Sequence, residues 1–208
     1  MLDPIIRSVI DPFLNKLARR LAKIGLSANM LTIAGFVFSI LGFITIYLGK
    51  YDLTLGLIIL SRIMDGLDGP LARQTAATDL GGYLDIVFDF IFYAGTIFFF
   101  ALGQPENALP AAFLIFSFMA TGTTFLAYAI IAAKHNINHD LQGKKSFFYI
   151  SGITEGTETI LVLIIICLFP EYFKLIAYIF GGLCWLTTIG RIYKAIKDFN
   201  NIDHGRMQ

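Results

Sequence analysis

The sequence predicts an all-α membrane protein with six transmembrane helices and an N-terminal amphipathic juxtamembrane helix. The first observation is composition: of 208 residues, 56% are hydrophobic and 15% are charged, whereas soluble domains carry about 25% charged residues. The second is a series of apolar segments of about the length that crosses a bilayer. The third is the uneven distribution of lysine and arginine between alternate connections.

Residues 1–26 form the first predicted unit, an amphipathic helix on the cytoplasmic face. Apolar residues recur at helical spacing through 3–25, and the other face carries Arg7, Lys16, Arg19, Arg20 and Lys23. A basic amphipathic helix suits the headgroup region of an anionic leaflet. The same apolar stripe would also let the helix dock on the bundle, and the two arrangements are compatible.

Residues 27–197 form the predicted transmembrane domain, and 198–208 a polar, frayed cytoplasmic tail. Gly25 and Ser27 end the first helix, and Asn29 is expected to cap the next. The six spans are expected near 29–48, 53–73, 79–102, 107–133, 147–169 and 172–195.

Charge sets the predicted orientation. Both termini and the connections 74–78 and 134–146 are expected on one side of the membrane. Most of the cations lie on that side: Arg7, Lys16, Arg19, Arg20, Lys23, Arg73, Lys134, Lys144, Lys145, Lys194, Lys197 and Arg206. The opposite side receives Lys50 and Lys174. Cytoplasmic loops carry the excess of cations, so both termini are expected in the cytoplasm.

The stretch 61–90 concentrates negative charge in an apolar part of the chain. Asp65 and Asp68 are spaced i,i+3, Asp85 and Asp89 are spaced i,i+4, and Asp79 falls in the intervening turn. A carboxylate near the bilayer centre costs roughly 2.5–3.5 kcal/mol on the gentlest scale, and ion pairing with Arg62 and Arg73 cannot balance four. Divalent ions that prefer oxygen ligands can balance this charge. We therefore expect two ions of Mg²⁺ or Mn²⁺ at this hairpin.

These residues also form a long motif. The motif has two halves separated by seven residues: Asp65-x-x-Asp68-Gly69-x-x-Ala72-Arg73 and Gly81-x-x-x-Asp85-x-x-x-Asp89. It resembles the signature of the CDP-alcohol phosphotransferases. Asn29 and Thr32 resemble that family's Pro-Asn-x-x-Thr start of the first span, with Ala28 where proline is usual.

The resemblance implies transfer of a phosphatidyl group from a CDP-linked lipid, such as CDP-diacylglycerol, to an alcohol, with release of CMP. By position, it implies that Asp65, Asp68 and Asp85 bind the metals and that Asp89 is the general base that also touches a metal. It implies CDP contacts from Asn29, Thr32, Gly69, Arg73 and Thr78. It further implies a multi-pass phospholipid synthase of the bacterial inner membrane and a homodimer through the third and fourth spans.

The identity of the acceptor alcohol is less well defined by the sequence than the reaction class. Lys134 and Arg191 would suit a phosphorylated acceptor such as glycerol 3-phosphate or an inositol phosphate. The resemblance favours glycerol 3-phosphate, the commonest acceptor among bacterial members of the family. Glu155 and Glu158 lie i,i+3 at the start of the fifth segment and could instead hold an amino alcohol. Positive-inside cations without a ligand, and a structural pairing of a glutamate with Arg191, are the plainer alternatives.

Two other classes fit less well. An intramembrane prenyltransferase would place two aspartate-rich motifs on widely separated helices, and a transporter would show inverted repeats and broken helices; neither pattern is visible. No nucleic-acid partner is expected. Cys167 and Cys184 lie in apolar runs without a CxxC pattern, so they predict small buried residues and no zinc site.

Overall fold

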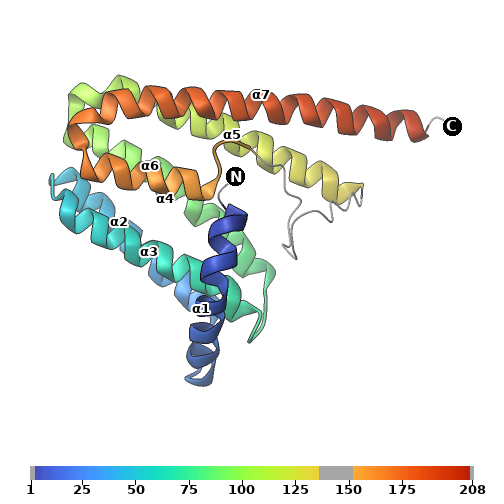
Figure 1. Cartoon of the computed structure of the whole chain (residues 1–208), viewed down its shortest axis with the longest axis horizontal. Coiled ribbons are helices and arrows are strands. Elements are labelled where there is room, and N and C mark those ends of the chain that lie inside the picture. Colours follow the sequence, from blue (N-terminus) through green and yellow to red (C-terminus); the bar gives the residue numbers. More distant parts are fainter. Residues whose placement is uncertain (1–2, 136–151, 207–208) are drawn as a thin grey trace.

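The computed structural model describes residues 3–135 and 152–206, and this part of the chain is almost wholly helical (Figure 1). Its helices are α1 Asp3–Lys23, α2 Ala28–Tyr47, α3 Tyr51–Ala72, α4 Asp79–Gly103, α5 Ala108–Lys134, α6 Gly156–Leu168 and α7 Phe173–Arg206. Short 3₁₀ turns, Pro105–Asn107 and Pro170–Tyr172, precede α5 and α7. The predicted all-α class is confirmed.

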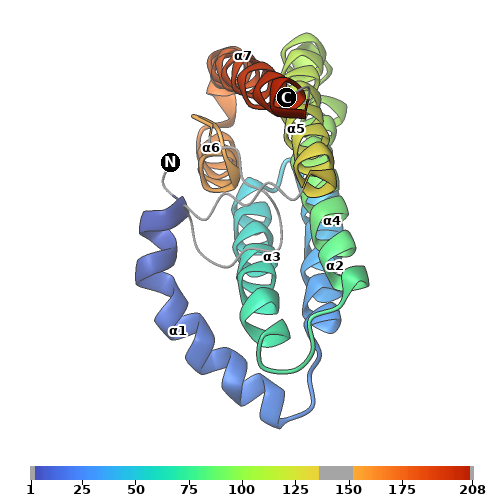
Figure 2. The ribbon, with the colours of Figure 1, turned by 90° about the vertical axis from the view of Figure 1, so that its right-hand side faces the viewer.

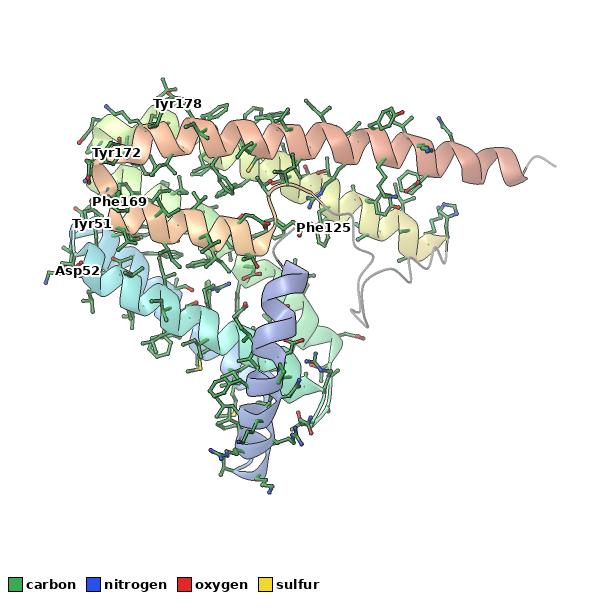
Figure 3. All side chains as sticks on the ribbon, viewed as in Figure 1. Tyr51, Asp52, Phe125, Phe169, Tyr172 and Tyr178 are labelled. Carbon is green, nitrogen blue, oxygen red and sulfur yellow. The ribbon has the colours of Figure 1, made fainter. Side chains whose placement is uncertain are left out.

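The tight connections gather at one end of the bundle. Figure 3 places Tyr51, Asp52, Phe169 and Tyr172 there together. From this end the helices diverge, so that α7 runs along one side of the molecule while α2, α3 and α4 lead toward α1 (Figure 1). The acidic motif therefore lies in the part of the bundle away from the tight turns.

The helix α1 stands beside α3 as a separate arm (Figure 2). Its buried Ala18 belongs to a cluster with Leu31 of α2 and with Leu67 and Leu71 of α3, while Lys16, Arg19, Arg20 and Lys23 are exposed. The predicted helix therefore forms and docks on the bundle. Its place at a membrane surface stays a prediction.

The expected cap of α2 was wrong by two residues. Ser27, in an extended conformation, is the N-cap, and its hydroxyl accepts a hydrogen bond from the Met30 amide. Gly25 before it has φ +81°, a conformation that glycine adopts readily. Because Ser27 caps the helix, Asn29 falls inside the first turn, where its side chain is available to another element.

Close approach of α2 to α3 positions the site. A Cβ added at Gly35 would lie 3.2 Å from the Met64 side chain and from the Ser61 carbonyl oxygen. One turn along, the Ser39 and Ser61 hydroxyls share a 2.8 Å hydrogen bond. On another face, α2 packs against α4, where Phe36 stacks on Phe88 at 4.0 Å. The helix α2 therefore supports both helices that carry the aspartates.

The larger core links α4 to α5, α6 and α7. Fully buried residues include Phe92, Phe100, Leu114, Leu163 and Phe173, and the Phe100 and Phe173 rings stack at 4.5 Å. Gly95 of α4 and Gly122 of α5 lie on the two spans through which a homodimer was expected. Within this chain a Cβ at Gly95 would overlap the Phe43 ring, and one at Gly122 the Phe90 ring, so both glycines serve intrachain packing.

Four described helical segments are long and apolar enough to cross a bilayer: 28–47, 79–103, 105–134 and 170–200. The helix α3 has 22 residues, about 33 Å at 1.5 Å per residue, but its charged residues lower its hydropathy. The helix α6 has 13 residues, about 20 Å, against a hydrocarbon thickness of about 30 Å. A multi-pass membrane protein is confirmed, and the count of six spans stays a prediction.

Two boundaries differ from the prediction. The fifth segment was expected from residue 147; residues 147–151 lie outside the described part, and the helix begins at Gly156. A frayed segment was expected at the C-terminal end, whereas α7 continues to Arg206. Its extension packs on α5: Tyr128 donates to Asp198 at 2.7 Å and stacks on Phe199.

Candidate active site

Three carboxylates converge from two helices. Asp65 and Asp68 lie one turn apart on α3, Asp85 lies on α4, and one oxygen of each falls within 4.8 Å of the others. Oxygen ligands of Mg²⁺ or Ca²⁺-sized ions lie about 2.0–2.6 Å from the metal, so ligands on opposite sides are about 4–5 Å apart. The three oxygens therefore fit around one hard cation, and the predicted helix faces do meet.

Thr32 of α2 holds Asp68 in place. Its hydroxyl donates to the Asp68 carboxylate at 2.6 Å and both side chains are buried. The close packing of α2 on α3 at Gly35, one turn away, accounts for this short distance. Thr32, predicted to touch the nucleotide, thus acts directly on a candidate metal ligand.

The predicted CDP contacts surround the turn between α3 and α4. Thr78 is the N-cap of α4 and accepts from the Gly81 amide at 3.0 Å. The Thr78 hydroxyl also lies 3.5 Å from Asn29 Oδ1. A Cβ on Gly81 would come within 2.6 Å of that same oxygen, so only glycine lets Asn29 reach this turn.

Arg73 is the remaining residue predicted to contact the CDP moiety. It is the C-cap of α3 and is exposed, and one of its guanidinium nitrogens would lie 3.7 Å from a Cβ at Gly69. This separation is ordinary van der Waals contact, so the guanidinium packs beside the α3 backbone at position 69. The structure gathers Asn29, Thr78 and Gly81 on one side and Gly69 and Arg73 on the other side of the turn 73–78.

Asp89 is not one of the three residues that converge within 4.8 Å, but it shares Arg62 with Asp65. One of its oxygens receives a hydrogen bond from Arg62 Nη1 at 2.5 Å, and the other receives the Tyr93 hydroxyl at 3.3 Å. Arg62 was not among the predicted site residues. The signal was present, because an arginine three residues before Asp65 in an apolar segment requires a partner.

The predicted acceptor residues occupy another region. Arg191 of α7 is 7% exposed and donates to the Thr121 carbonyl at 3.0 Å, and its guanidinium lies 5.6 Å from the Phe125 ring centre. Lys134 is exposed in the last turn of α5. Lys144 and Lys145 lie outside the described residues.

Glu155 and Glu158 form a capping box at the start of α6. Glu155 is the N-cap, and the Glu158 carboxylate accepts from the Glu155 amide at 3.2 Å. Glu155 also accepts from the Gly152 amide at 2.9 Å. Both carboxylates therefore satisfy amides that a helix start leaves open.

The start of α6 connects this region to Asp89. Thr187 of α7 accepts hydrogen bonds from the Ile153 and Thr154 amides, both at 3.1 Å. At the other end of this short segment, a Cβ on Gly156 would lie 3.5 Å from the Tyr93 hydroxyl, which in turn contacts Asp89. The start of α6 therefore lies close to the predicted base, with Tyr93 between them.

Comparison with known proteins decides the family. The family model described as CDP-alcohol phosphatidyltransferase matches residues 26–190. The chain belongs to the CDP-alcohol phosphatidyltransferase family. It is thus a transferase of substituted phosphate groups, as the motif predicted, and the matched range contains the three-aspartate group, Asp89 and the start of α6.

Curated relatives of this phosphatidyltransferase span nearly the whole chain. The inner membrane protein YnjF of Escherichia coli is 47% identical over 93% of this chain and 94% of its own length. The archaetidylinositol phosphate synthase of Pyrococcus horikoshii is 31% identical over 95% of this chain and 97% of its own.

Solved structures share the phosphatidyltransferase fold. The Mycobacterium tuberculosis phosphatidylinositol phosphate synthase PgsA1 with CDP-DAG bound has a TM-score of 0.62 and 20% identity, covering 88% of this chain and 92% of that one. The same enzyme in complex with manganese and citrate has the same score and identity and covers 88% of each chain. At this identity the likeness supports the helical arrangement.

Proposed function

We propose that this enzyme transfers a phosphatidyl group from a CDP-linked lipid, such as CDP-diacylglycerol, to an inositol phosphate and releases CMP. The observation that carries the proposal is the convergence of Asp65, Asp68 and Asp85 oxygens within 4.8 Å beside the turn 73–78, in a chain of this family. Membership defines the reaction class, and the three carboxylates provide the place where a diphosphate–metal complex would sit.

Asp65, Asp68 and Asp85 would hold Mg²⁺ or Mn²⁺, with Asp89 as the nearest further carboxylate for a second ion. A bound divalent ion neutralises phosphate oxygens and stabilises the charge of a phosphoryl displacement. Thr32 orients Asp68, and partners of this kind typically matter 10- to 100-fold for metal affinity or activity. The manganese in the PgsA1 structure supports this choice of ion.

Around the turn, the chain would bind the CDP moiety. The exposed Arg73 can donate to diphosphate oxygens in a bidentate manner. Asn29 and Thr78 offer polar atoms on the other side of the turn, and Gly69 leaves room for the ligand. The CDP-DAG in the PgsA1 structure supports a CDP-linked lipid as donor.

Asp89 would act as the general base. The acceptor hydroxyl gives its proton to the Asp89 carboxylate as its oxygen forms a bond to the lipid-linked phosphorus. The bond between that phosphorus and the CMP oxygen breaks, and CMP leaves with the electron pair. A positioned base of this kind contributes typically 10²–10⁴-fold.

The curated relative, and not a feature of the acceptor region, favours an inositol phosphate over the glycerol 3-phosphate expected from the sequence. The relative that is 31% identical across almost the entire chain is an archaetidylinositol phosphate synthase. Arg191 supplies a cation for the phosphate, while Glu155 and Glu158 form the α6 cap rather than an amine site. Lys134 would add positive charge where the acceptor approaches from the cytoplasm.

We also propose that α2–α7 form six spans, that α1 lies on the cytoplasmic face and that both termini are cytoplasmic. The inner-membrane relative supports placement in a bacterial inner membrane. A homodimer would use the exposed faces of α4 and α5, including Phe98, Phe116 and Met119. Reporter fusions at each terminus test the orientation: a periplasmic reporter active at either end contradicts it.

The decisive experiment measures CMP release by the purified protein in vesicles containing CDP-diacylglycerol. We expect turnover with inositol phosphate and Mg²⁺ or Mn²⁺, and little with glycerol 3-phosphate, ethanolamine, choline or serine. EDTA should stop turnover, and either metal should restore it. Turnover that survives chelation would contradict the metal site, and preference for another alcohol would replace the acceptor while leaving the reaction class intact.

A further inference from the structure

Arg62 bridges the two acidic helices from within the bundle. Its Nη1 lies 2.5 Å from an Asp89 oxygen on α4 and 3.5 Å from an Asp65 oxygen on its own helix α3. The Arg62 side chain is 12% exposed. A charge buried to this extent is strongly destabilising unless it is paired, so the pairing with these carboxylates is a fixed part of the site.

The guanidinium is held from several directions. It lies over the Phe92 ring, 4.1 Å from the ring centre, and its Nη2 donates to the Ser61 hydroxyl at 3.1 Å. Ser61 in turn shares a hydrogen bond with Ser39 of α2. Residues of α2, α3 and α4 therefore fix the plane of the guanidinium, which a flexible lysine ammonium would not allow.

The arginine is retained at a cost. Its Nε is buried and has no hydrogen-bond partner among the described residues. Leaving a buried donor unsatisfied is unfavourable. An apolar residue would avoid that cost but would leave Asp65 and Asp89 without the cation that they share, so the arginine is explained by the carboxylates that it pairs.

The two oxygens of Asp89 have unequal partners. Arg62 binds one at 2.5 Å, while Tyr93 reaches the other at 3.3 Å from the side of α6. The closely bound oxygen fixes where the carboxylate points. The loosely bound oxygen lies beside Tyr93, whose hydroxyl is close to the start of α6, because a Cβ added at Gly156 would lie 3.5 Å from it.

We propose that Arg62 is a positioning residue for the base. It holds Asp89 by an ion pair that also reaches Asp65, so that the oxygen beside Tyr93 stays directed toward the acceptor hydroxyl. This inference rests on the proposed function for its kinetic consequence, while the ion pair itself can be tested without turnover. Arg62 also gives Asp89 a positive partner that does not depend on bound metal.

The test compares Arg62→Gln and Arg62→Lys with the wild type, with Arg19→Gln, an exposed arginine on α1, as control. Arg62→Gln should lower kcat about 10- to 100-fold, as for other orienting partners, with the KM for the CDP-lipid unchanged. Arg62→Lys should recover part of the loss because it keeps the charge without the planar fork. The Mn²⁺ affinity, followed by electron paramagnetic resonance, should change less than in Asp85→Asn.

An infrared readout separates this inference from the proposed function. In metal-free protein, subtraction of the Asp89→Asn spectrum identifies the Asp89 carboxylate band, and Arg62→Gln should shift it. An unshifted band overturns the ion pair, and a folded Arg62→Gln protein with unchanged kcat overturns the positioning role. If Arg62→Gln does not fold, Arg62→Lys carries both comparisons. Absence of turnover in the wild type with every acceptor refutes the proposed function, while the band shift still decides the pairing.

Discussion

Two polar regions lie within the same apolar bundle and use their carboxylates in opposite ways. On α3 and α4, Asp65, Asp68 and Asp85 converge on one another, which is favourable only if a cation joins them. At the start of α6, Glu155 and Glu158 turn to backbone amides and cap the helix. An acidic residue in a membrane helix thus indicates either chemistry or helix termination, and its partners decide which.

The largest expected effect is on the converging group. Asp85→Asn removes a candidate metal ligand while keeping the side-chain size, so we expect turnover to fall more than about 100-fold, as losses of key electrostatic groups do. Mn²⁺ affinity should fall with it in a direct titration. Asp79→Asn, an exposed residue in the first turn of the same helix, is the matched control and should be nearly neutral.

Arg191→Gln should act on the acceptor alone. A hydrogen bond to a charged group contributes about 1.5–3 kcal/mol, so the KM for the phosphorylated acceptor should rise about 10- to 100-fold, whereas the KM for the CDP-lipid should hold. Steady-state kinetics with each substrate varied in turn measures this split. A parallel rise in both constants would place Arg191 in the general support of the bundle.

Thr32→Val tests whether the orientation of Asp68 matters for metal binding by the three aspartates. The variant loses the 2.6 Å bond to Asp68 but keeps the shape, so metal affinity should fall about 10-fold, at the lower end for such partners. Thr45→Val is the matched control, because Thr45 is also buried on α2 and bonds to Thr54 at 2.8 Å near the tight turns. Equal metal affinities in the two variants would contradict the role of Thr32.

The smallest effect is expected at the α6 cap. Glu158→Gln can still complete a capping box, so its acceptor preference and stability should stay close to those of the wild type. Glu158→Ala should lower the free energy of unfolding by about 1 kcal/mol, a usual cost for a lost cap. A changed acceptor preference in Glu158→Gln would instead place this carboxylate in contact with the acceptor.

The sequence predicted the hairpin well because spacing carries geometry there. The i,i+3 and i,i+4 intervals set Asp65, Asp68, Asp85 and Asp89 on helix faces, and a short turn obliges those faces to meet. The motif identified Thr32 as a site residue. Its hydrogen bond to Asp68 depends on how closely α2 approaches α3, and Gly35 alone does not predict that distance. The pairing of Asp89 with Arg62 could not be predicted from spacing, because it depends on Arg62 reaching across from α3 to α4.

The helix ends were harder to predict. The predicted fifth segment ran through 147–169, so the pattern did not reveal that α6 begins at Gly156, with Glu155 as its N-cap. At the other terminus, polar residues after 198 read as a tail, whereas contacts of Asp198 and Phe199 with Tyr128 keep α7 helical. Both differences arise from tertiary contacts between residues far apart in the sequence.

The tight turns at the Tyr51 end have a consequence for how the enzyme is made. They pair α2 with α3, α4 with α5, and α6 with α7, so the chain can enter a bilayer as three helical hairpins. The three aspartates belong to two of these units: Asp65 and Asp68 to the first and Asp85 to the second. No single hairpin contains the complete group, so during biogenesis metal binding should begin only when the second unit docks on the first.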